Sequence, residues 1–204
     1  MIEASMQQEQ PMPVKYLCAC ALIGLLALAP ASAVPVEPQA ATATQSGDDA
    51  APSQESVDHE LDLFRRAGVS LHQAMRIAEK IHPGSVTADI SFDGALGAPL
   101  YKVRTIKSGQ VFECDVDGIT AEVKNSALFS SLQELNELDR HNLAALRAAH
   151  LKMSDAVLIA EKSAAGKAIA GGLANNDGRL SFIIIVVSNG GLKQVQLEPA
   201  PGRH

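Results

Sequence analysis

The chain has 204 residues, enough for one or two small domains, because a single hydrophobic core commonly encloses about 100 to 150 residues. Aromatic residues make up only 3% and Trp is absent, so Ala, Val, Ile and Leu must build any core. The formal net charge is −6, and residues 34–60 contain six acidic residues and no Lys or Arg. An acidic chain lacks the positive surface that nucleic-acid binding requires, which argues against a nucleic-acid partner.

Residues 1–33 have the layout of a secretory signal peptide. Lys15 precedes an apolar run from Tyr16 to Ala29, and the small residues Ala31-Ser32-Ala33 follow Pro30. We expect cleavage after Ala33 and a periplasmic or secreted mature protein, with an uncleaved anchor as the alternative. The apolar run is shorter than the roughly 20 residues that a transmembrane helix needs. We therefore expect no membrane span after cleavage. The leader itself begins at either Met1 or Met12.

Residues 34–57 are rich in Pro, Ala, Ser, Thr, Gln and acidic residues and show no repeating apolar face. Such a composition buries too little surface to offset the entropy of ordering, so we expect a flexible linker. Cys18 and Cys20 are removed with the leader. Cys114 then remains as a single cysteine, which predicts a mature chain without an internal disulfide.

An internal repeat is the most informative feature of the sequence. The tetrapeptide Ile77-Ala78-Glu79-Lys80 recurs 82 residues later as Ile159-Ala160-Glu161-Lys162. Further along the chain the offset becomes 81, as in the pair Tyr101 and Phe182. We therefore predict two copies of one unit with a connector between them, and the boundaries are 58–123 for the first copy, 124–139 for the connector and 140–204 for the second copy.

Each copy has the same expected order of elements. Ser70 and Gln73 have the spacing of a capping box ahead of a helical apolar pattern that stops at His82-Pro83-Gly84. Three strands follow, at about 86–92, 100–106 and 111–116, with a tight turn before the last. The second copy has Asn189-Gly190 at that turn, a strong hairpin signal. The expected fold is α+β: two tandem α-β-β-β units, each a helix on a three-stranded antiparallel sheet, joined by a helical connector.

Both copies resemble the PepSY domain, a module found in propeptides of thermolysin-type metalloproteases and in bacterial envelope proteins. The matching stretches are Ser70 to Val123, which ends in Val-Asp-Gly-Ile-Thr-Ala-Glu-Val, and Met153 to Arg203, which ends in Leu-Glu-Pro-Ala-Pro-Gly-Arg. Neither has the complete Val-Asp-x-x-Thr-Gly-like closing turn of the family: Ala121 replaces Gly in the first, and Glu198 and Pro201 replace Asp and Thr in the second. The resemblance implies a non-catalytic module that inhibits or regulates peptidases or binds protein segments near the cell surface.

Two classes of function follow from these patterns. The first is a protein-binding module, not an enzyme, whose partner is a peptidase or another envelope protein; we expect no catalytic residues, no cofactor and no metal site. The second is an envelope sensor or binder of a small ligand or divalent cation. That alternative depends on Asp115, Asp117 and the equivalent histidines His59 and His141, which lack further ligands at metal-binding spacing. The oligomeric state stays open.

Other repeated positions have structural explanations. Cys114 aligns with Val195 of the second copy, which favours a buried structural cysteine over a reactive one. The pairs Glu79-Lys80 and Glu161-Lys162 are expected on solvated helix faces.

The strand from Phe182 to Val187 is apolar on both faces, so its second face needs a cover. Ile183, Ile185 and Val187 would lie against the first copy or the connector leucines, or would face a partner. The leucine spacing predicts two helices or one bent helix over 126–149 that packs on the sheet or binds a partner helix, and the leucines are Leu128, Leu132, Leu135, Leu138, Leu143 and Leu146.

Overall fold

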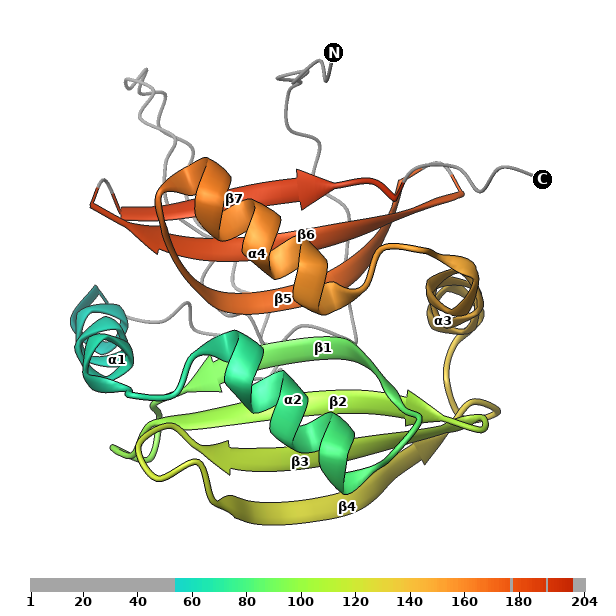
Figure 1. The fold of residues 1–204 in the computed structure, drawn as a ribbon, viewed down its shortest axis with the longest axis horizontal. Coiled ribbons are helices and arrows are strands. Elements are labelled where there is room, and N and C mark those ends of the chain that lie inside the picture. Colours follow the sequence, from blue (N-terminus) through green and yellow to red (C-terminus); the bar gives the residue numbers. More distant parts are fainter. Residues whose placement is uncertain (1–53, 177, 190, 200–204) are drawn as a thin grey trace, which may run out of the picture.

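Seven antiparallel strands form one sheet in the computed structural model of this protein, and two helices, α2 and α4, lie side by side on one face of it (Figure 1). The structure describes residues 54–176, 178–189 and 191–199. The expected signal peptide at 1–33 and most of the expected linker, residues 34–53, lie outside the described residues.

The elements follow one another as four helices and seven strands. The helices are α1 (Gln54–Arg66), α2 (Leu71–Ile81), α3 (Glu137–Ala148) and α4 (Met153–Ala164). The strands are β1 (Val86–Asp93), β2 (Leu100–Lys107), β3 (Gln110–Asp117), β4 (Val123–Ser131), β5 (Gly166–Asn176), β6 (Arg179–Ser188) and β7 (Gly191–Leu197). In the sheet their order is β4-β3-β2-β1-β5-β6-β7, so β4 and β7 form the two edges.

The α+β class expected from the sequence is confirmed, and the order α-β-β-β occurs twice, as α2-β1-β2-β3 and α4-β5-β6-β7. The expected arrangement of a three-stranded sheet in each unit is not confirmed. The first half has a fourth strand, β4, and the two halves join through β1 and β5 into one sheet. Taken alone, each half would leave an inner strand edge unpaired, and the two edges pair with each other at Ile90–Gly171 and Ser91–Ala170.

The expected helical connector at 124–139 is wrong for most of its length. Residues 123–131 form β4, which pairs with β3, and only at Glu137 does helix α3 begin, with Asn136 as its N-cap. Leu128, Leu132 and Leu135 have helical spacing, but Asn125, Ser126 and the Ser pair at 130–131 favour a helix poorly. A turn over residues 117–122, closed by the hydrogen bond from the N–H of Asp117 to the carbonyl of Glu122, moreover returns the chain beside β3. At the other end, α1 begins at Gln54, inside the expected linker at 34–57.

A local two-fold relation connects the two halves. Ile90 of β1 pairs with Gly171 of β5. Gly171 lies 81 residues after Ile90, so the two paired residues occupy equivalent positions in the two halves. The change of offset from 82 to 81 falls between the helix and the first strand of each half, where α4 runs on to Ala164. Because β1 and β5 are equivalent strands and pair antiparallel, the local two-fold axis passes through this residue pair. The strands β4 and β7 therefore lie at opposite ends of the sheet (Figure 1).

The core lies between the sheet and the helices α2 and α4. Both helices present alanines to the sheet, Ala74 and Ala78 in α2 and their counterparts Ala156 and Ala160 in α4, and all four are buried. Small residues at these positions allow a close approach of helix and sheet. The capping box of Ser70 and Gln73 at the start of α2 is confirmed.

Candidate functional site

The two free edges of the sheet are the parts of the described structure where a further strand could pair. Edge strands expose a row of unpaired backbone N–H and C=O groups, which is the basis of strand addition by a partner. Apolar side chains lie on or next to both edge strands. The two edges differ in whether the strand pairs with its neighbour in continuous register.

The β4 edge has two exposed apolar residues, Leu128 and Phe129, at 55% and 49% of their full accessible surface. Its pairing with β3 shifts register twice, between Val111 and Phe112 and between Asp115 and Val116. Register shifts of this kind twist an edge and disrupt its hydrogen-bonding row, which discourages the addition of another strand.

Side chains on both faces tie β4 to the rest of the molecule. On the helix side, Ser126 Oγ lies 2.9 Å from Nε2 of His82, whose ring stacks on Phe112 with centroids 4.3 Å apart. On the other side, the guanidinium of Arg104 lies 4.2 Å from the centroid of the Phe129 ring and also bonds Glu113. These contacts fix β4 as part of the first half.

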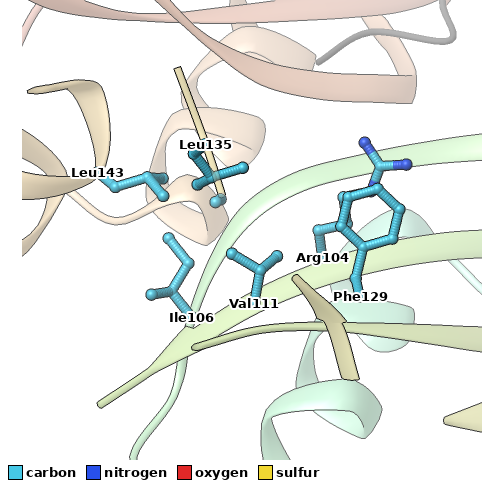
Figure 2. A pocket seen from close by; sticks show the side chains of 7 residues that line it. Arg104, Ile106, Val111, Phe129, Leu135 and Leu143 are labelled. Atoms are coloured by element: carbon cyan, nitrogen blue, oxygen red, sulfur yellow. The ribbon is translucent and has the colours of Figure 1, made fainter. Parts of the chain in front are cut away.

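The face opposite α2 carries a small apolar pocket, and Arg104 and Phe129 are among the residues that line it (Figure 2). Leu135 and Leu143 reach over Ile106 and Val111 from the segment that follows β4. The packing role expected for the connector leucines is therefore seen for part of the set. Leu132 and Leu135 are half-buried, and Leu143 and Leu146 are buried, whereas Leu128 and Leu138 are exposed.

Ile183, Ile185 and Val187, which were predicted either to pack against the rest of the chain or to face a partner, lie on one face of β6. Ile185 is only 8% exposed, while Ile183 and Val187 are half-buried. Their alternation with Phe182, Ile184 and Val186, which belong to the core, places them on the face away from α4. Their role as a partner-facing set stays a prediction.

Cys114 lies in the core as expected, with no exposed surface. Burial, with a smaller contribution from the charge of Asp115, raises the pKa of its thiol to about 11. A thiol with that pKa stays protonated at neutral pH and is a poor nucleophile.

The residues behind the alternative of a cation site are spread over the structure. His59 on α1 and His141 on α3 are both exposed, and the described residues contain no group of three or more His, Cys, Asp or Glu that could hold a metal ion. Asp117 instead organises the turn before β4: its Oδ1 accepts from the backbone N–H groups of Ile119 and Thr120. These two hydrogen bonds lower the pKa of the carboxyl group.

Two equivalent glutamates, Glu79 and Glu161, have a role that their sequence pattern did not predict. Glu79 was expected on a solvated face, but it is half-buried and accepts hydrogen bonds from the backbone N–H and the hydroxyl of Thr87, at 3.1 and 2.8 Å. Glu161 accepts from the backbone N–H of Ala168 at 2.9 Å. The signal available in the sequence was the retention of Glu in both copies. The neighbouring Lys80 and Lys162 are exposed, as expected.

Among the described helices, none has the combination of length and apolar character needed to cross a bilayer. No protein-family model matches the chain, and no curated protein matches it. Among solved structures it is similar to a candidate lipoprotein from Clostridium difficile 630, with 16% sequence identity and a TM-score of 0.39, over 69% of this chain and 93% of that one. That degree of likeness assigns neither a family nor a function.

Proposed function

We propose that this chain is a non-catalytic, exported binding module of PepSY type, which binds and modulates a peptidase or another protein of the cell envelope. The leader-like residues 1–33 support export, and the residue matches in both copies support the PepSY type. The observation that carries the binding role is a sheet with two unpaired edges. The edge strand β4 carries the exposed side chains of Leu128 and Phe129, and the edge strand β7, which packs against α4, carries the half-buried side chains of Val195 and Leu197.

This arrangement suits recognition of polypeptide. An unpaired strand edge offers alternating N–H and C=O groups, which only another extended backbone satisfies along its whole length. Apolar side chains beside that edge add burial on binding, and each of them contributes on the order of 1 kcal/mol or more when fully covered.

The test is affinity capture followed by reconstitution. Residues 34–204 are immobilised, incubated with envelope extract, and the captured proteins are identified by mass spectrometry. We expect a peptidase or another envelope protein, and the purified candidate should bind residues 34–204 at a fixed stoichiometry. For a peptidase, its rate on a peptide substrate should change when the module is added.

A thermal-shift screen with Mg²⁺, Ca²⁺, Mn²⁺ and Zn²⁺ on the same preparation separates the two function classes. Stabilisation by one of these ions, together with no reproducible protein partner, would overturn the proposal in favour of a cation binder. Capture that persists with a heat-unfolded module would also overturn it, because such binding does not depend on the fold.

A further inference from the structure

Two equivalent strands, β3 and β7, have different surroundings in the sheet. Strand β3 lies between β2 and β4, whereas β7, its counterpart at an offset of 81, lies at the edge of the sheet. The first half therefore has four strands and the second has three. The described structure contains no strand on the outer side of β7.

The missing neighbour leaves apolar positions of the second half exposed. On the helix side of β3, Cys114 and Val116 have no exposed surface, while their counterparts Val195 and Leu197 on β7 are only half-buried. On α4, which contacts β7, Ile159 is 46% exposed, whereas its counterpart Ile77 in α2 is half-buried. One added strand beside β7 would bring the second half to the burial of the first.

We propose that the outer edge of β7 binds one extended segment of a partner protein as an eighth, antiparallel strand beneath the flank of α4. This inference rests on the proposed binding function and names the surface and the partner segment for it. It distinguishes β7 from β4, because β7 pairs with β6 without a register shift from Gly191 to Leu197, while β4 is irregular at two places. A regular edge presents its donors and acceptors in line for an incoming strand.

The first half supplies a template for the segment that would bind. Beside β3, Val123 lies opposite Val116, Ser126 opposite Cys114 and Leu128 opposite Phe112. Transferred to β7, these positions call for an apolar residue opposite Leu197 and a small residue opposite Val195.

The position on β7 that corresponds to Phe112 is occupied by a charged residue, so it also favours a particular charge in the incoming strand. Lys193 is the counterpart of Phe112 (112 + 81 = 193); it is exposed, and the described residues form no salt bridge with it. An acidic residue of the incoming strand would lie opposite this ammonium group, and cross-strand pairs of opposite charge stabilise sheets. Read from its N-terminus, the partner segment is therefore apolar, any, small, any, acidic.

The probe is an eight-residue peptide with the sequence VNSAEFSS. It is the β4 sequence without Lys124, where the register shifts, and with Glu in place of Leu128, so its Glu would lie opposite Lys193. The matched control peptide, VNSAKFSS, differs only in the sign of that charge. Fluorescently labelled peptides are titrated with residues 34–204, and binding is followed by anisotropy at low and high salt.

We expect VNSAEFSS to bind roughly fivefold more tightly than VNSAKFSS at low salt, because attraction is replaced by repulsion in one exposed cross-strand pair. The Lys193→Glu variant should reverse this preference. Lys124→Glu on the β4 edge is the protein control and should leave both affinities unchanged. Unlike Lys193, Lys124 is ion-paired with Asp117 and Glu122, so circular dichroism first checks that this variant is folded. Equal affinities for the two peptides, no saturable binding, or a response to Lys124→Glu in place of Lys193→Glu would overturn the assignment of β7.

The same protein preparations also test two other possible occupants of the β7 edge, a second copy of the chain and the chain's own N-terminal segment. A dimer seen by light scattering without peptide and abolished by Lys193→Glu would make a second copy of the chain the occupant. Tighter peptide binding after deletion of residues 34–53 would assign the edge to the chain's own N-terminal segment. Either result would overturn a partner strand at this edge.

Failure of this inference differs measurably from failure of the proposed function. If residues 34–204 capture an envelope protein and the Lys193→Glu variant captures it equally well, the binding function stands and the β7 edge is not its site. If the wild-type chain captures no such protein, the binding function itself fails.

Discussion

At the scale of single residues, the equivalent glutamates Glu79 and Glu161 connect each helix to the strand that follows it. Glu79 accepts two hydrogen bonds from Thr87, and Thr87 is only 3% exposed. A carboxylate that accepts from a backbone N–H and a hydroxyl fixes the angle between helix and strand more firmly than apolar contact does, because hydrogen bonds are directional.

The first prediction concerns Glu79. Glu79→Ala leaves the N–H and hydroxyl of Thr87 without their acceptor and should lower the free energy of unfolding by about 1 to 3 kcal/mol in urea denaturation. Glu79→Gln keeps an acceptor oxygen and should cost less. Lys80→Ala, on the neighbouring exposed position, is the control and should stay within about 0.5 kcal/mol of wild type. Equal effects of the alanine variants at 79 and 80 would contradict a bridging role.

The second prediction concerns Cys114, whose counterpart in the second half is Val195. Cys114→Val should change the free energy of unfolding by less than about 1.5 kcal/mol at pH 7, because it replaces one small apolar side chain by another that is larger by one heavy atom. The wild-type thiol should not react with a maleimide unless urea is present. Labelling of the native protein within minutes at pH 7 would contradict this.

The same thiol makes stability depend on alkaline pH. The pKa of Cys114 is raised from 9.0 to about 11 in the folded state, so the unfolded thiol ionises first as pH rises. The stability that the protonated Cys114 thiol contributes to the folded state is fully present below pH 9 and is lost as pH rises from 9 towards 11. Cys114→Val lacks the titrating group and should lose less stability over that range when both proteins are unfolded in urea.

At the scale of elements, strand β6 is the most thoroughly buried strand of the second half. Ile185 is 8% exposed on the face away from α4, although its counterpart in the first half is the half-buried Arg104 (104 + 81 = 185). Arg104 is held by Glu113 and by the ring of Phe129. Across from Ile185 lie Ala170 and Gln194, neither of which supplies a negative charge.

The third prediction follows from that difference. Ile185→Lys places a charge without a cross-strand partner in a buried position and should lower the free energy of unfolding by about 3 kcal/mol or more. Gln194→Lys, on the exposed cross-strand neighbour, is the control and should be nearly neutral. Circular dichroism and size-exclusion chromatography provide the measurement. A folded Ile185→Lys protein that elutes later than wild type would instead make the set Ile183, Ile185 and Val187 a partner surface.

At the scale of the whole molecule, the seam between β1 and β5 decides whether the halves fold together. Ile90 pairs with Gly171 and Ser91 with Ala170 across it. A Cβ added at Gly171 would lie 3.0 Å from Cδ1 of Ile184 and 3.1 Å from Sδ of Met153. The absence of a side chain at Gly171 therefore permits α4 and the sheet to pack closely at the seam.

The fourth prediction is that both halves unfold in one transition. Amide signals of β2 and β6, followed by NMR through urea denaturation, should have the same midpoint, since the halves share one sheet and one core. Gly171→Val should lower both midpoints together, with a cost of about 1 to 3 kcal/mol from overpacking. Gly68→Ala, where a Cβ would have no neighbour within 4 Å, is the control for added volume alone. Separate midpoints for β2 and β6 would show that the seam does not couple the halves.

The sequence by itself determined the local elements and their repetition. The capping box at Ser70, the alternation in β1 and the shared offset predicted the α-β-β-β order in both halves, because these signals depend on residues a few positions apart. The burial of Cys114 followed from its match with Val195. These predictions needed no knowledge of how the halves meet.

Tertiary structure alone decided the remaining features. Strand β4 replaced an expected helix because the free edge of β3 supplied hydrogen-bond partners that the leucine spacing of 128, 132 and 135 does not reveal. The union of β1 with β5, the bonding of Glu79 to Thr87 and the free edge at β7 likewise depend on pairs distant in sequence. Which strand edges are paired, and which stay open to a partner, is a property of the assembled sheet, since every strand carries the same backbone donors and acceptors.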